Sequence, residues 1–455
     1  MLRSLWLVLV YASFLGLGLA APFVAALGYV WVDATTPQSI AWFILPSLPV
    51  AQIMGAGAFF SYLLLDRRDP PRPNAALVLT VLLALWVTLT TAGWAVVPDA
   101  AWVKWSWAFK AVAFSAFLPF VFRSRVQIEA FLQVLVFSAM ANILAPGVKT
   151  LVSGGGYHSA LGFVTANTGF GEGGFLSTVA LMIVPTILFL RRHSVLMPRL
   201  PLVGVGYLGL VVACVSCAIG TYERSALVGL AVLGVALWWH SRRKVVVGGL
   251  LMTAAVVIGV TVSGAWQERI STIQTYKNDN SALTRLAVWQ WTLEFAASQP
   301  LGGGFDVYRI DTIHTPPTPT EPEGGEQHGR AFHSIYFEML GEQGWVGLGL
   351  FGGVVLSCFL SLRRVARYAA GDPALAWCRD LSTALSAGLA TYLACGAFVG
   401  IGFQPMLWYM VAASICLSAH VRRLRTSARR EIAWRPSRGE TGVTPLPAWR
   451  QPSRL

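Results

Sequence analysis

Residues 201–221 read PLVGVGYLGLVVACVSCAIGT, a run that is apolar throughout and carries no charge. A helix needs about 20 such residues to cross the hydrocarbon core of a bilayer. Comparable runs recur along most of the chain, which is 55% hydrophobic and only 12% charged over 455 residues. Soluble domains average about 25% charged residues. The composition therefore excludes an ordinary soluble enzyme and predicts an all-α polytopic membrane protein.

Twelve apolar runs are candidate transmembrane helices. They lie near residues 5–31, 40–65, 75–97, 101–121, 127–150, 173–190, 201–221, 225–240, 245–264, 344–362, 381–400 and 403–420. Basic side chains cluster in every second connection, for example over 67–72, 191–199 and 242–244, and again in the C-terminal tail. Cytoplasmic loops carry an excess of Lys and Arg. The pattern therefore predicts that both termini are cytoplasmic.

This topology divides the chain into four parts. Residues 1–264 hold the first nine predicted helices, 265–343 form one long periplasmic insertion, 344–420 hold the last three helices, and 421–455 form a basic cytoplasmic tail. The tail is Pro-rich and has little periodicity, so we expect a disordered anchor beside anionic lipid headgroups. Because the net charge of +13 comes from short clusters between apolar runs, it indicates membrane topology and no nucleic-acid partner.

The periplasmic insertion is the long polar stretch between spans and the expected location of an active site. Its first part, residues 281–298, has helical periodicity that places Leu286, Trp289, Leu293 and Ala297 on one apolar stripe. We expect this helix to lie along the membrane surface with Trp289 at headgroup depth.

The rest of the insertion predicts a turn and a loop, followed by a second helix. Residues 300–305 predict a tight turn, and residues 312–329, rich in Pro, Thr, Glu and Gly, predict a mobile loop. Residues 332–344 resume helical periodicity and lead into the tenth span.

Basic residues outside the cytoplasmic clusters are the candidates for function, and they are Lys104, Lys110, Lys149, Arg224, Arg269, Lys277, Arg285, Arg309 and Arg330. Arg224 lies between two spans, where a charge is costly unless it has a partner or a ligand. Its planar guanidinium suits two phosphate oxygens, although pairing with Glu223 is an alternative. Arg285 shares a helix face with Trp289, and its alternative is simple solvation.

His333 opens the helix that follows the predicted loop. A histidine there is either a surface residue or a general base for a reacting hydroxyl. The histidines and glutamates of this region do not have the spacing of a known metal site, so we expect no metal and no cofactor. These residues are His314, Glu321, Glu323, Glu326, His328 and His333.

Three segments together resemble the O-antigen ligase and polymerase superfamily of bacterial envelope polysaccharide assembly. They are Thr221-Tyr-Glu-Arg-Ser-Ala, Leu283-Thr-Arg-Leu-Ala-Val-Trp with Pro300-Leu-Gly-Gly-Gly-Phe, and His333-Ser-Ile-Tyr-Phe-Glu-Met-Leu-Gly-Glu-Gln-Gly-Trp-Val-Gly-Leu. The resemblance covers roughly residues 175–420. The first 170 residues resemble more loosely the N-terminal region of exosortase-associated O-glycosylation ligases.

The resemblance implies a metal-independent membrane glycosyltransferase, GT-C-like, in the bacterial inner membrane. Its donor would be an undecaprenyl-pyrophosphate-linked glycan on the periplasmic side, and its other partners a lipid or glycan acceptor and membrane lipids. It further implies that Arg224 and Arg285 bind the donor pyrophosphate and that His333 serves the acceptor. Candidate supporting residues are Tyr222, Trp289, Ser334, Tyr336 and Glu338.

Several functions remain open at this point. A ligase would join the glycan to lipid A core or another envelope acceptor, as in lipopolysaccharide biosynthesis, whereas a polymerase would extend a lipid-linked glycan. A protein O-oligosaccharyltransferase is a further alternative. A transporter or flippase is disfavoured, because the sequence has neither repeat symmetry nor charges deep in several helices.

Overall fold

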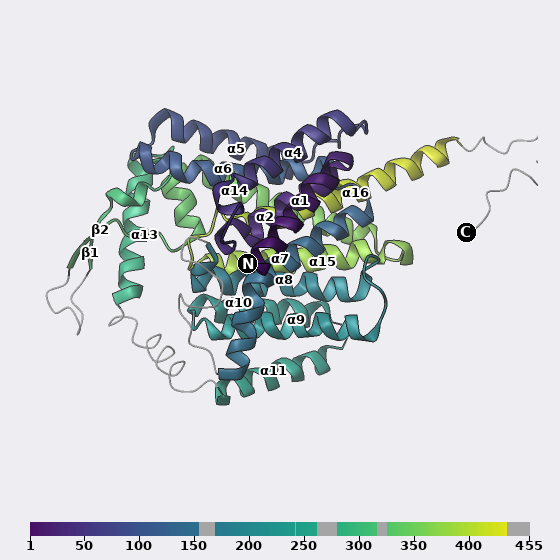
Figure 1. Cartoon of the computed structure of the whole chain (residues 1–455). Helices are drawn as coiled ribbons and strands as arrows, with labels where there is room; N and C mark the ends of the chain where they lie inside the picture. Colours follow the sequence, from purple (N-terminus) through teal and green to yellow (C-terminus); the bar gives the residue numbers. More distant parts are fainter. Residues whose placement is uncertain (154–168, 242, 262–279, 316–324, 435–455) are drawn as a thin grey trace, which may run out of the picture.

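The computed structural model describes residues 1–153, 169–241, 243–261, 280–315 and 325–434. These residues form a bundle of helices with a small β-hairpin at one end (Figure 1). Its α-helices are α1 (Leu2–Ala20), α2 (Pro22–Thr35), α3 (Pro37–Ile40), α4 (Val50–Leu65), α5 (Ala75–Trp94), α6 (Pro98–Val121), α7 (Arg125–Ser153), α8 (Gly173–His193), α9 (Pro201–Gly220), α10 (Arg224–His240), α11 (Lys244–Thr261), α13 (Asn280–Ser298), α14 (Ile335–Tyr368), α15 (Ala376–Gly396) and α16 (Pro405–Trp434). The strands β1 (Thr312–Thr315) and β2 (Gly325–His328) pair antiparallel.

Six of the described helices are long and apolar enough to cross a membrane, namely α1, α5, α7, α8, α9 and α14. Two more, α4 and α10, are apolar but shorter. The helical fold agrees with the predicted all-α membrane protein, while the number of twelve spans stays a prediction. Within the bundle α8 is buried along nearly its whole length, as expected for a helix that is apolar on every side.

The N-terminal apolar run 5–31 forms two helices, so the prediction of one span there is wrong. The backbone leaves the helical region at Ala21 (φ −139°, ψ 100°), directly before Pro22. Proline is tolerated in the first turn of a helix but not inside one, so α2 starts anew. A Cβ on Gly18 would lie 2.6 Å from the Cβ of Ala25, which shows how closely the two helices approach at their turn.

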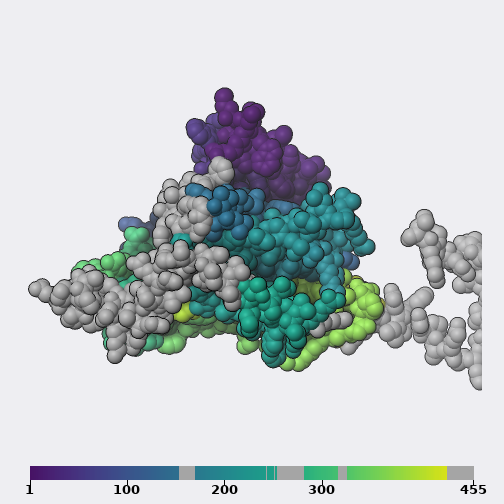
Figure 2. Space-filling view, turned by 90° about the horizontal axis from the view of Figure 1, so that it is seen from below, coloured from purple at the N-terminus to yellow at the C-terminus, as the bar shows by residue number. Residues whose placement is uncertain are grey.

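The pair of helices α1 and α2 separates the N-terminus from the C-terminal tail. The Ser4 hydroxyl accepts a hydrogen bond of 2.9 Å from the backbone N–H of Trp42, in the segment before α4. Arg3 lies over the Trp42 ring, 5.8 Å from its centroid. The N-terminal helices stand out from the body of the molecule in Figure 2.

The basic connections gather at the end of the bundle opposite α13, where the last described turns of α16 also lie (Figure 1). Arg125 donates to the His193 carbonyl at 3.0 Å. Arg423 donates to the Arg123 carbonyl at 2.6 Å, and Arg422 to the Pro73 carbonyl at 3.1 Å. The connections predicted to face the cytoplasm are thus neighbours in space, and α13 with the hairpin lies at the opposite end.

These contacts also explain why the C-terminal tail differs from its prediction. The tail was expected to be disordered from residue 421, but α16 continues without a break to Trp434. Its arginines donate to carbonyls at the ends of other helices, and Arg425 lies 5.0 Å from the centroid of the Tyr368 ring. Residues 435–455 lie outside the described residues.

The insertion differs from its prediction in two places. The expected mobile loop over 312–329 contains β1 and β2, and its centre, 316–324, lies outside the described residues. In α13 the buried face consists of Val288, Thr292 and Ala296, while Leu286 and Leu293 are about half exposed. Of the predicted stripe, Trp289 does pack on α14, where it stacks on Phe337.

Candidate functional site

The predicted site residues lie around two cavities at the end of the bundle that carries the insertion. The first has a volume of about 40 Å³ and is lined by Tyr222, Glu223, Arg224, Ser225, Ser281, Arg285 and Phe398. The second has a volume of about 320 Å³ and is lined by Val103, Lys104, Trp107, Glu172, Asp306, Tyr308, Ala331, Phe332, His333, Glu338, Gly400 and Gln404. The connection between α15 and α16 contributes to both.

Arg224 is positioned by the tight turn between α9 and α10. The Thr221 hydroxyl donates to the Ala218 carbonyl at 2.8 Å, and Tyr222 adopts a left-handed conformation with φ 53°. The reversal makes Arg224 the first residue of α10. Its side chain thereby faces the small cavity, rather than the lipid that a span-end arginine would reach by snorkelling.

Arg285 reaches the same cavity from α13, about one turn after that helix begins. The starts of α10 and α13 therefore meet here. Each helix start carries the positive end of a peptide dipole, and each adds a guanidinium. Glu223 also lines the cavity. The combination of two helix starts and two arginines favours a multivalent anion.

The second cavity depends on a kink in α14. Gly344 has φ 66° and ψ −170°, and a Cβ there would lie 2.3 Å from the Pro300 carbonyl oxygen. The predicted turn over 300–305 packs against α14 at this kink. Its Gly303 and Gly304 N–H groups donate hydrogen bonds to carbonyls of α14 at 3.0 and 2.9 Å. The Trp86 indole of α5 donates to the Gln343 carbonyl at 2.9 Å.

The turn over 300–305 brings Asp306 close to Lys104 of α6, and both residues line the cavity. Lys104 Nζ donates to Glu338 Oε1 at 2.8 Å and to Glu342 Oε1 at 2.7 Å, and it lies 3.7 Å from Asp306 Oδ1. Glu338 Oε2 also accepts from the Gly402 N–H at 2.8 Å. One buried ammonium therefore holds three carboxylates and joins four segments of the chain.

His333 lies at the rim of this cavity, next to the start of α14. Its backbone is left-handed, with φ 47°. The preceding carbonyl, that of Phe332, accepts a hydrogen bond of 2.9 Å from the Trp289 indole, and Trp289 stacks on Phe337 at 4.8 Å. Trp289 thus positions the histidine through the backbone before it, while its place at headgroup depth stays a prediction.

The surroundings of His333 favour the neutral imidazole. The His333 side chain is exposed at the rim, but desolvation by the protein groups around it and the positive charges of Arg285 and Arg330 lower its pKa below the usual value. A neutral imidazole is the form that accepts a proton. The influence of Arg285 on this pKa also shows that the two cavities are within electrostatic range of each other.

Glu172 is a site residue that the motif analysis missed. It precedes the first residue of α8 and lines the His333 cavity. Although Glu172 is partly exposed to solvent, desolvation by neighbouring groups together with the charges of Glu223 and Glu338, opposed by Arg285, raises its pKa to about 7. The available signal was an acidic residue after a glycine-rich turn, directly before an apolar span.

The remaining supporting residues separate into two groups. Tyr222 and Glu338 line the cavities. Ser334 is buried at the start of α14, and the Tyr336 hydroxyl donates to the Leu393 carbonyl of α15 at 3.1 Å, so both stabilise the helix junction.

Backbone strain is concentrated at the two cavities. In the described residues five non-glycine residues have positive φ, and three of them, Tyr222, Asp306 and His333, line one or the other cavity. Such conformations cost about 1–3 kcal/mol each and are typical of functional sites.

In the part of the chain that the structure describes, no group of three or more His, Cys, Asp or Glu side chains is arranged to hold a metal ion. Asp306, Glu338 and Glu342 converge, but the ammonium of Lys104 lies between them. Glu321 and Glu323 lie outside the described residues. The expected absence of a metal therefore stays a prediction.

Two family models match the chain. Residues 2–195 match a family of unknown function, and residues 208–352 match the family described as O-antigen ligase. No curated protein is similar enough to count as a relative. Arg224, Arg285, His333 and the kink at Gly344 all lie within the second match. The second match identifies residues 208–352 as an O-antigen ligase domain, which supports the resemblance of this part of the chain to that superfamily.

Proposed function

We propose that this protein transfers a glycan from undecaprenyl pyrophosphate to an acceptor hydroxyl, as an O-antigen ligase-type glycosyltransferase. The observation that carries the proposal is that Arg224 and Arg285, from separate helices, line one cavity beside the cavity that holds His333. The first arrangement suits a pyrophosphate and the second a hydroxyl that must lose a proton.

The donor pyrophosphate would bind at the small cavity. As the bond between the anomeric carbon and the pyrophosphate oxygen breaks, negative charge grows on the leaving group. Two guanidiniums and two helix starts stabilise that charge more in the transition state than in the ground state. Because these groups supply the positive charge, the proposed mechanism requires no metal ion.

The acceptor would enter the larger cavity. Its hydroxyl oxygen forms the new bond to the anomeric carbon, and its proton passes to His333. The lowered pKa of His333 keeps the imidazole ready to accept that proton at neutral pH. Lys104 and its carboxylates hold the cavity wall in place, so that the two substrates meet in a fixed geometry.

The site would face the periplasm of the inner membrane. The support is the charge distribution: the basic connections lie at the opposite end of the bundle, and positively charged connections favour the cytoplasm. A lipid-linked pyrophosphate lies at the membrane surface, which suits a cavity built at the ends of membrane helices.

The direct test is turnover by the purified full-length protein with a defined lipid-linked glycan. Lipid A core, a protein acceptor and a second lipid-linked glycan are offered in parallel, each with and without excess EDTA. We expect transfer to one acceptor class, unchanged by EDTA, and the class that reacts separates ligase, protein ligase and polymerase. Translocation of the donor across proteoliposomes without any transfer would contradict the proposal.

A further inference from the structure

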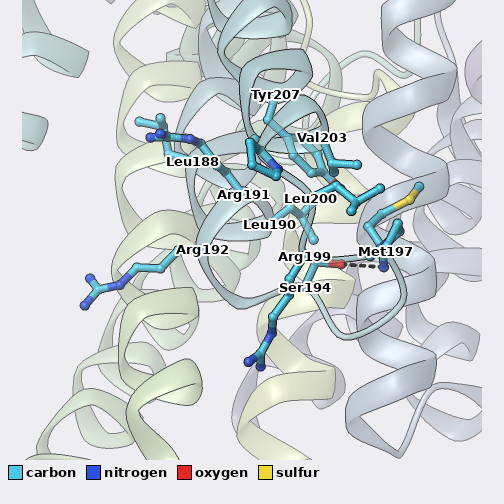
Figure 3. Close-up of a pocket in the computed structure, with 13 residues that line it drawn as sticks. Leu188, Leu190, Arg191, Arg192, Ser194, Met197, Arg199, Leu200, Val203 and Tyr207 are labelled. Carbon is cyan, nitrogen blue, oxygen red and sulfur yellow. Dashed lines mark hydrogen bonds between the residues drawn. The ribbon is translucent and has the colours of Figure 1, made fainter.

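The end of the bundle opposite the candidate site contains two larger cavities, on either side of the last turns of α8. One has a volume of about 560 Å³ and lies between α8 and α9. Its arginines, Arg191, Arg192 and Arg199, point in different directions (Figure 3). They do not converge on a shared position, so this cavity gives no indication of a ligand.

The other cavity, of about 730 Å³, lies between α8, α10, α11 and α15. Here the cationic side chains converge on Asp380. Arg192 Nη1 lies 3.2 Å and His193 Nε2 2.8 Å from Asp380 Oδ2, while Arg379 Nε lies 3.1 Å from Oδ1. Arg243 also lines this cavity, so that it contains three arginines and one aspartate. The cavity mouth therefore keeps an excess of positive charge.

These arginines remain accessible to a ligand. The Arg192 side chain is 72% exposed despite its contact with Asp380, and Arg243 is exposed as well. Asp380 fixes the orientation of Arg192 and Arg379 without covering them. A guanidinium held in this way loses little freedom when it binds a phosphate oxygen.

Below the charged mouth, the walls of the cavity are apolar. The apolar lining residues are Pro185, Leu188, Phe189, Leu237, Val246 and Ala387. They come from α8, α10, α11 and α15, and so they extend from the basic end towards the middle of the bundle. Positive charge at the mouth and an apolar wall beneath it match the two halves of a phospholipid.

We propose that this cavity binds an anionic phospholipid. The phosphate lies between Arg192, Arg379 and Arg243, and an acyl chain runs along the apolar walls. Basic pockets between membrane helices on the cytoplasmic side are suited to anionic headgroups. The apolar walls favour a lipid over free phosphate, and the excess positive charge favours an anionic over a zwitterionic headgroup. The inference is independent of the proposed glycosyl transfer.

The test is native mass spectrometry of the delipidated full-length protein in detergent, titrated with phosphatidylglycerol and, separately, with phosphatidylcholine. We expect phosphatidylglycerol to bind more tightly, and Arg192→Gln/Arg379→Gln to weaken its binding about tenfold or more, since two cationic contacts with the anionic headgroup are lost. Arg243→Gln, which breaks no contact with Asp380, should weaken binding less but in the same direction.

The matched control is Arg191→Gln/Arg199→Gln, which removes two charges from the neighbouring cavity and should leave lipid binding unchanged. Equal binding of the two lipids would overturn the proposal, as would equal losses in the control and in the Arg192→Gln/Arg379→Gln variant. Displacement of phosphatidylglycerol by millimolar inorganic phosphate would show that the site recognises phosphate alone, and would also overturn it.

Discussion

The two cavities of the candidate site differ in charge and in how their side chains are held. Arg224 and Arg285 bring positive charge to a space of about 40 Å³ at the starts of two helices. The cavity of about 320 Å³ next to it is lined by Glu172, Asp306 and Glu338 as well as Lys104. A polyanion is therefore favoured in the first cavity and disfavoured in the second.

This difference suggests a division of labour between two parts of the chain. The cationic cavity is built almost entirely from the region that matches O-antigen ligase, residues 208–352. The second cavity also needs Lys104 and Glu172, which belong to the region matched to a family of unknown function. The N-terminal region thus completes the site, on the side that we assign to the acceptor.

The largest expected effect comes from His333. His333→Ala should lower transfer by about 10²–10⁴-fold, because the acceptor hydroxyl loses its proton acceptor. In the wild type, the rate should fall with decreasing pH only below the ordinary imidazole pKa, since the pKa of His333 is lowered. His314→Ala and His328→Ala, on the hairpin strands, are the controls and should be nearly silent. Equal losses of transfer in all three variants would contradict the role of His333 as proton acceptor.

Loss of either arginine in the cationic cavity should lower transfer by about 10²–10³-fold, the typical cost of removing one group that stabilises a developing anion. Arg224→Lys and Arg285→Lys should rescue poorly, because an ammonium cannot contact two oxygens in the planar geometry of a guanidinium. The rates are measured with purified variants at saturating acceptor. Near-normal turnover of Arg224→Lys would argue against bidentate phosphate binding and weaken the contrast between the cavities.

Lys104→Met should reduce stability rather than act on the chemistry directly. It leaves Glu338, Glu342 and Asp306 buried without their shared cation, and removal of one partner from a buried ion pair costs about 3–5 kcal/mol. Thermal unfolding in detergent is the measurement. Lys104→Met/Glu342→Met should recover part of the loss, because one uncompensated charge disappears with it. An unchanged Tm for Lys104→Met would show that the cluster does not hold the second cavity together.

A smaller effect is expected from Glu172. Its pKa of about 7 in the folded protein lies above the ordinary 4.5, so the folded state retains a proton that the unfolded chain has lost. Its contribution to stability is therefore full at low pH and is lost as the pH rises through about 7. Glu172→Gln should raise the Tm relative to wild type at about pH 8 and change it little at about pH 4. Equal Tm differences at the two pH values would contradict the assignment.

The two arginines of the first cavity and His333 were predictable from sequence, whereas the other charged groups of the second cavity were not. Arg224, Arg285 and His333 stand in short local motifs, and the structure places all three around adjoining cavities. Lys104 was a candidate only because it lies outside the basic clusters. Its partners come from α14 and the turn over 300–305, far along the chain, and no local pattern pairs them. Glu172 was missed for the same reason.

The errors in the fold also have local causes. The break within the run 5–31 is not visible in its hydropathy, because Pro22 is itself an apolar residue. Its effect on the helix comes from its backbone, which starts the new helix α2. The tail from residue 421 lacks apolar periodicity, but its arginines find carbonyls at neighbouring helix ends, and α16 continues. Of the stripe predicted for α13, Trp289 packs on α14, whereas Leu286 and Leu293 are about half exposed because the helix turns Val288, Thr292 and Ala296 inward.

The central claim is that the donor phosphates bind at one cavity and the acceptor is activated at the other. The most direct test measures donor affinity and turnover on the same preparations of Arg285→Ala and His333→Ala, using the lipid-linked glycan without acceptor for the affinity. We predict that Arg285→Ala loses donor affinity and turnover together, whereas His333→Ala binds donor like the wild type and loses only turnover. If donor binding collapsed in His333→Ala as well, His333 would be a phosphate ligand or a structural residue, and the division between the two cavities would be wrong.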